Sequence, residues 1–174
     1  MTRGAFLAFL VVASPASAEI VSAGPNAFEL EQSVDIAAAP PVVWATPGRI
    51  GTWWNPEHSY SGEAGSLRIA LTAGACFCEA LPRGGTVEHM RVVHAAPHEL
   101  LRLEGALGPL AAEAVNGVLE LRLAHEGGGT RLTATYRASG FARGNAAQFA
   151  GPVDGVLGEQ WARLKAVAEG RPVS

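Results

Sequence analysis

The hydrophobic period of the last segment, which begins close to residue 150, differs from that of the strands before it, and this change restricts the fold more than any other feature. Between residues 28 and 136, apolar residues recur at every second position in short runs, as in half-buried strands. Beyond residue 150 the spacing becomes three or four, at Val153, Leu157, Trp161, Leu164 and Ala168, which predicts an amphipathic helix. A sheet with one apolar face must be covered, and only this final helix is long enough to cover it. The pattern predicts an α+β domain.

The predicted strands occupy residues 28–36, 67–71, 76–81, 86–93, 100–107, 118–123 and 132–136. Two short helical pieces, at 42–44 and 50–54, follow the first strand. Glycine-rich turns at 82–85 and 126–129 are too short for a crossover helix, so an antiparallel sheet of about six or seven strands is expected. No repeat or linker interrupts residues 27–170, which we interpret as one domain after a short lead at 19–26.

The N-terminus has the pattern of a secretory signal peptide. Arg3 provides a positive charge, residues 5–13 are apolar, and small residues end at Ala18. Cleavage after Ala18 is expected, and the mature protein is then secreted or periplasmic. A retained N-terminal anchor is the alternative, but the apolar stretch is shorter than a bilayer-spanning helix needs.

The composition excludes some partners. The chain has 48% hydrophobic and 17% charged residues, a formal net charge of -3 and no run of basic residues. Nucleic acid is therefore not expected as a partner, because phosphate binding needs clustered Lys and Arg. No segment after residue 18 is long and apolar enough to predict a stable membrane span. No cofactor is predicted, and the oligomeric state is not determined by the sequence.

This element order, with APPVVW at 39–44, TWWNP at 52–56 and Gly74-Ala75, resembles the START-like or SRPBCC superfamily. The resemblance extends from about Phe28 to Glu169 and is closest to the polyketide-cyclase and ATPase-activator-like branch. It implies the helix-grip fold, in which a curved antiparallel sheet wraps a long C-terminal helix around an apolar cavity. Members include lipid carriers, ligand-binding proteins, cyclases and chaperone co-activators, so the fold alone does not choose a function. The signal peptide argues against co-activation of a cytosolic ATPase.

The leading hypothesis is an exported, non-enzymatic protein that holds a small hydrophobic or aromatic molecule between sheet and helix. Aromatic side chains suit such a pocket because they combine apolar area with a polar tip. The predicted pocket walls are Trp53, Trp54, His58, Tyr60, Tyr136, Val153, Leu157 and Trp161. For either tryptophan alone, simple packing of the helices onto the sheet is the competing interpretation.

The predicted hairpin at 76–93 contains the most unusual residues. If Leu81 pairs with Thr86, then Cys78 lies opposite His89, Cys76 opposite Arg91, and Glu79 opposite Glu88. Cys76 and Cys78 point to the same face because they are two residues apart on a strand. A slip of one residue would remove the Cys78–His89 and Glu79–Glu88 juxtapositions.

Three interpretations of the two cysteines remain open. They can pack as small apolar side chains, with His89 hydrogen-bonded nearby. They can form a disulfide, which export favours, although neighbours at i and i+2 lie near the upper limit of Cα separation for a bridge. They can also form a metal or redox site with His89, because thiolate and imidazole are ligands for zinc or copper.

The rival to a binding protein is an enzyme of the cyclase or dehydratase type. In that hypothesis His89 transfers protons together with Glu79 or Glu88. Nucleophilic catalysis is not supported, because the sequence has no G-x-S-x-G motif and no nucleophile with a recognisable base. Which face of the hairpin lines the interior cannot be derived from the alternation, since neither face is cleanly polar.

Overall fold

The computed structural model describes residues 17–173, and its main layer is one antiparallel sheet of eight strands in the order β1-β2-β8-β7-β6-β5-β4-β3. The strands are β1 (Ser17–Ala23), β2 (Ala27–Ile36), β3 (Leu67–Arg68), β4 (Cys76–Ala80), β5 (Thr86–Ala96), β6 (Leu100–Gly105), β7 (Val115–Glu126) and β8 (Gly129–Gly140). Antiparallel pairing is therefore confirmed. The strand count exceeds the prediction because Ser17–Ala23, interpreted as the end of a signal peptide and a short lead, forms an edge strand along β2.

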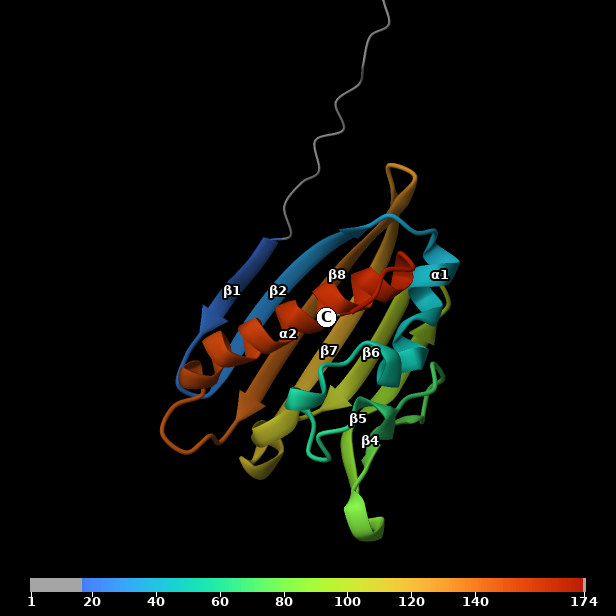
Figure 1. Cartoon of the computed structure of the whole chain (residues 1–174). Coiled ribbons are helices and arrows are strands. Elements are labelled where there is room, and N and C mark those ends of the chain that lie inside the picture. Colours follow the sequence, from blue (N-terminus) through green and yellow to red (C-terminus); the bar gives the residue numbers. More distant parts are fainter. Residues whose placement is uncertain (1–16, 174) are drawn as a thin grey trace, which may run out of the picture.

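One long helix, α2 (Ala147–Ala168), lies across one face of the sheet, as the helix-grip fold requires (Figure 1). The helix begins six residues before Val153, the first apolar position of the predicted period. Residues 147–152 contain Gly151 and Pro152, which weaken the helical pattern in the sequence. None of the described helices is both long and apolar enough to cross a bilayer.

Alternation along β2 fixes which face of the sheet meets α2. Phe28, Leu30, Val34 and Ile36 are all buried, as predicted, and Gln32 is buried between them. The buried residues of β2 pack with those of β6, β7, β8 and α2 in one continuous core. The helix and the inner face of the sheet are therefore in direct contact through their side chains.

A short helix and three 3-10 turns connect β2 to β3. They are α1 (Pro40–Ala45), Pro47–Thr52, Pro56–His58 and Ala64–Ser66. Residues 47–66, called the cover segment below, lie on the same side of the sheet as α2 (Figure 1). Asn55 connects the segment to α2, since its backbone N–H donates to Oε1 of Gln160 at 2.8 Å and its side chain donates to Glu159 at 2.6 Å.

The predicted signal peptide falls mostly on residues 1–16, which lie outside the described residues. Cleavage after Ala18 would leave Glu19–Ala23 of β1 paired with β2.

Candidate functional site

The β4–β5 hairpin has one extra residue on β5, and this irregularity decides which side chains meet. Cys76 pairs with Arg91, as predicted, but Cys78 pairs with Glu88 and Glu79 with Val87. The predicted Cys78–His89 and Glu79–Glu88 juxtapositions are therefore wrong. The register shifts between Phe77 and Cys78, which makes a β-bulge with two residues of one strand opposite one of the other.

The bulge turns His89 toward the core. His89 and its neighbour Met90 are both buried, whereas Glu88 is exposed. Nε2 of His89 lies 2.9 Å from Oε2 of Glu79, a carboxylate with no exposed area. Glu79 also accepts hydrogen bonds from the backbone N–H groups of Tyr60 and Ser61, so the pair joins the hairpin to the cover segment.

The protonation of this pair follows from its surroundings. Burial raises the pKa of Glu79, but hydrogen bonds from Ser61, Tyr60 and His89 outweigh it and leave the pKa below its ordinary value. Burial lowers the pKa of His89 and outweighs the opposing effect of Glu79. At neutral pH a neutral imidazole therefore donates from Nε2 to an ionised carboxylate. Nδ1 is then an acceptor, and no hydrogen bond to it is found within residues 17–173.

Aromatic rings enclose His89 on two sides. The Tyr60 ring stacks on it with centroids 5.8 Å apart, and the Phe77 ring lies 4.8 Å away. Tyr60 is 54% exposed, and its hydroxyl donates to the carbonyl of Gly108 at 2.9 Å. Trp54 continues the cluster, with its ring 5.6 Å from that of Phe77. Tyr60 therefore forms the outer cover of the Glu79–His89 pair.

The residues predicted to line a cavity lie mostly in the core. Five of them are no more than 7% exposed: Trp53, Trp54, Tyr136, Leu157 and Trp161. Val153 is partly buried against the same cluster, and burial raises the pKa of the Tyr136 hydroxyl to about 12. His58 is exposed and contacts Glu159 at 3.1 Å. These side chains contact one another or α2, so they do not present a free surface to a ligand between the sheet and the helix.

The space between sheet and helix is nearly filled. A void of about 10 Å³ remains, lined by Val43, Trp44, Pro47, Leu101, Leu121, Leu123, Leu132 and Leu164. It is about the size of one water molecule, whereas drug-sized ligands occupy some hundreds of Å³. None of the predicted wall residues lines it. The prediction of an open cavity beneath the tryptophan pair is therefore wrong for this conformation. A recess of about 280 Å³ lies elsewhere, between α2 and the C-terminal residues.

Two polar atoms in the layer between sheet and helix lack partners. The indole N–H of Trp161 and Oε1 of Gln32 are buried, and neither has a hydrogen bond to any residue in the described range. The Gln32 side chain donates instead to Asp154 on α2, at 2.8 Å to its carbonyl and 2.6 Å to its carboxylate. Trp161 was predicted as a wall residue, but Gln32 and the buried Gln160 were missed. The strand period places Gln32 on the inner face of the sheet, and the helix period places Gln160 on the inner face of the helix. The same periods could therefore have predicted both glutamines as buried polar residues.

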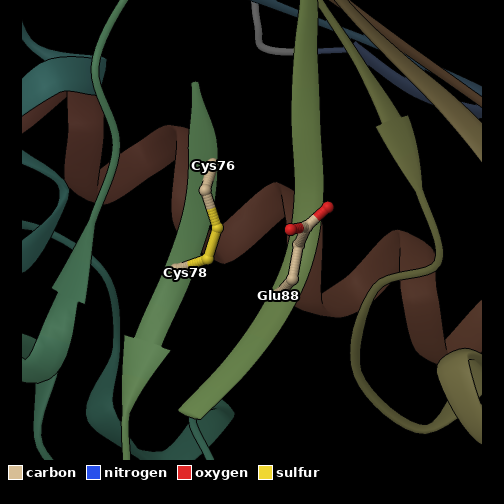
Figure 2. A group of neighbouring side chains, drawn as sticks. All are labelled: Cys76, Cys78 and Glu88. Atoms are coloured by element: carbon tan, nitrogen blue, oxygen red, sulfur yellow. A yellow bond between two sulfur atoms is a disulfide. The ribbon is translucent and has the colours of Figure 1, made fainter. Parts of the chain in front are cut away.

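The outer face of the hairpin carries the cysteines. A disulfide joins Cys76 to Cys78, with Cα atoms 5.3 Å apart, and Glu88 lies beside it on β5 (Figure 2). Glu88 forms an ion pair with Arg91. Of the two carboxylates considered as partners of His89, the structure brings Glu79 into contact with it and separates Glu88 from the pair. It also separates His89 from the two cysteines with which it was predicted to bind metal.

Several solved structures have the same fold. CalU16 from Micromonospora echinospora matches with a TM-score of 0.61 and 16% identity over 92% of this chain and 88% of that one. MLL2253 from Mesorhizobium loti matches with a TM-score of 0.60 and 14% identity, over 83% and 99%. DynU16, a protein of the dynemicin biosynthetic locus, matches with a TM-score of 0.56 and 17% identity, over 83% and 48%.

No curated protein sequence matches the chain. The sequence profile of one family does match, over residues 27–169, which include every described element from β2 to α2. With the helix-grip topology and the long antiparallel sheet, this match shows that the chain belongs to the polyketide cyclase / dehydrase and lipid transport family.

Proposed function

We propose that the chain binds a small hydrophobic or aromatic molecule between the sheet and α2, and that the described conformation is the closed, ligand-free form. The observation that carries this proposal is the buried Trp161 indole N–H without an acceptor. Leaving such a donor unpaired costs about 1–3 kcal/mol. A ligand with one acceptor atom and an otherwise apolar body would remove that cost.

The family supports the same class of ligand. Its description includes lipid transport and the cyclisation or dehydration of polyketides, all of which involve largely apolar molecules. DynU16 is a protein of a biosynthetic locus, which is consistent with such a ligand.

Binding requires the cover segment to move, because the present void is too small for an organic molecule. Tyr60 is the most exposed aromatic residue of that segment and bridges to Gly108 by one hydrogen bond. Asn55 fixes the segment to α2 by two further hydrogen bonds. Ligand uptake would proceed by release of the Tyr60–Gly108 contact and displacement of the segment from α2.

The test is a binding screen with wild type and three variants, of which Tyr60→Ala is used to open the cover segment. Wild type, Trp161→Phe and Trp53→Phe are titrated with a panel of fatty acids, polyaromatic phenols and ketones, with melting temperature and tryptophan fluorescence as readouts. Trp53 is the matched control because its indole N–H already donates to the Thr46 carbonyl at 2.9 Å. Ligands that bear an acceptor should bind Trp161→Phe roughly tenfold more weakly, and Trp53→Phe nearly as well as wild type. The proposal is refuted if no compound of the panel binds saturably, even to a Tyr60→Ala variant.

A second candidate is a cyclase-type or dehydratase-type reaction at Glu79 and His89. The observation in its favour is the Nδ1 acceptor of a neutral, oriented imidazole, with the Glu79 contact at 2.9 Å. After Tyr60 moves, Nδ1 could accept a proton from a bound substrate. If ligands from the screen are converted, His89→Gln should abolish turnover while affinity is kept. Glu88→Gln, on the outer face, is the control and should retain turnover.

Export is part of the proposal. The pattern of residues 1–18 supports it, and a disulfide is compatible with an oxidising compartment. Mass measurement of protein isolated from its own host should give a chain that begins at Glu19. An intact chain in the cytoplasmic fraction would contradict this expectation.

A further inference from the structure

The outer face of the β4–β5 hairpin holds a second group of reactive side chains. Cys76 and Cys78 lie on β4, and the Glu88 carboxylate lies on β5 opposite Cys78 (Figure 2). One ligand atom from each of the three residues lies within 4.8 Å of the others. The group is separate from Glu79 and His89, which point to the inner face of the same strands.

We propose that reduction of the Cys76–Cys78 disulfide creates a site for one thiophilic divalent ion of the Zn²⁺ type. Both thiolates and the Glu88 carboxylate would bind the ion, and water would take a fourth position. Two sulfurs and one carboxylate oxygen match the ligands that zinc accepts. The site differs from the sequence prediction in one ligand, because the bulge exchanges His89 for Glu88.

The neighbouring charges favour the ionised thiols that a metal requires. The register places Arg91 opposite Cys76 on one side and Arg68 opposite Cys78 on the other. Guanidinium groups near a thiol favour its thiolate, which is both the metal ligand and the nucleophile. Glu88 is at present paired with Arg91, but both side chains are nearly half exposed, and such pairs contribute little to stability. The carboxylate can therefore turn to an ion at small cost.

The disulfide and the metal use the same sulfur atoms and exclude each other. Cys76 is half-buried and Cys78 is only 8% exposed, so a thiolate from a dithiol reductant attacks Sγ of Cys76. Cys78 leaves as a thiolate, the second thiol of the reductant resolves the mixed disulfide, and the reductant departs as its own disulfide. Reoxidation by a small-molecule disulfide reverses these steps and releases the ion. Metal binding is thus restricted to the reduced protein.

The experiment titrates the folded protein with Cd²⁺, used as the probe, in the reduced and the disulfide forms. We expect the reduced wild type to bind one equivalent with sulfur-to-metal charge-transfer absorption, and the oxidised protein to show none. Cys76→Ser and Cys78→Ser should lose this absorption, and Glu88→Gln should weaken affinity at least about tenfold. Glu104→Gln is the matched control, because Glu104 is an exposed carboxylate opposite Arg91 on β6 that lies outside the group, and it should bind as wild type.

A second readout does not depend on variants. Alkylation of the reduced wild type should modify both cysteines, and one equivalent of Zn²⁺ should protect both, as measured by intact mass. The proposal is overturned if the reduced protein binds no stoichiometric ion, if the serine variants keep the absorption, or if Zn²⁺ leaves alkylation unchanged. Equal affinity in Glu88→Gln and wild type would overturn the assignment of the carboxylate as a ligand.

Discussion

The unpaired indole of Trp161 gives a prediction about the free protein that needs no ligand. Trp161→Phe keeps an aromatic ring in the core but removes the buried donor. Trp53→Phe makes the same substitution in a neighbouring ring, 6.5 Å away, whose N–H is hydrogen-bonded to the Thr46 carbonyl. Both rings are 2% exposed, so the cavity left by the smaller side chain should be similar in the two variants.

The difference between the variants isolates the contribution of the two N–H groups. Removing an unsatisfied buried donor should contribute about 1–3 kcal/mol of stability, and removing a satisfied one should cost about 0.5–1.5 kcal/mol. The cavity costs both variants about 1 kcal/mol and cancels in the comparison. Trp161→Phe should therefore be more stable than Trp53→Phe by about 1.5–4.5 kcal/mol.

Urea unfolding followed by circular dichroism measures this difference, provided that both variants unfold with the same dependence on denaturant. Tryptophan fluorescence is less suitable because each variant lacks one of the reporting indoles. Equal stability of the two variants would refute the reasoning, since it would mean that the Trp161 N–H makes a hydrogen bond in the wild type as strong as that of the Trp53 N–H. A stability of Trp161→Phe below that of Trp53→Phe would contradict it more strongly.

Three further predictions concern the rest of the fold. Burial raises the pKa of Glu169, but hydrogen bonds from the Ala37 N–H, Lys165 and Arg171 outweigh it and lower the pKa to about 2. The carboxylate therefore stabilises the fold above about pH 4.5, and this stability is lost as the pH falls toward 2. Glu169→Gln should flatten the pH dependence of urea stability between these two pH values. Gly117→Ala should lower the melting temperature strongly and reduce soluble yield, because a Cβ there would lie 2.7 Å from the Tyr136 ring and hydroxyl. Gly155→Ala should instead stabilise the protein by up to about 1 kcal/mol in urea, because a Cβ at this exposed helical position meets nothing within 4 Å.

The sequence predicts the element order well because strand and helix periods are local properties. Alternation over 28–36 and the three- and four-residue spacing after 150 identify β2 and α2 directly. Strand β1 was missed because small residues ending at Ala18 are typical of a signal peptidase site, and nothing in Ser17–Ala23 alternates clearly. Its place beside β2 depends on a free sheet edge, which is a property of the folded protein.

The filled interior could not be predicted from the same patterns. Periodicity identifies which residues face inward, but not whether their side chains meet across the layer. Trp53, Trp161 and Leu157 were predicted as pocket walls, and in the structure all three are buried in the continuous core. Packing depends on the summed volumes and rotamers of many side chains, so it becomes visible only when all the elements are in position.

A single inserted residue on β5 divides the chemistry of the hairpin between its two faces. With regular pairing, the two glutamates would lie opposite each other and repel, and His89 would lie beside the thiols on the outer face. The bulge removes this repulsion, because it gives Glu79 a buried imidazole and two backbone donors while Glu88 stays outside with Arg91. The inner pair and the outer cysteines therefore lie on opposite faces of the same two strands. Cys76 and Cys78 flank Phe77 on β4, and the Phe77 ring lies 4.8 Å from that of His89, so one short strand carries the disulfide on one face and part of the His89 environment on the other.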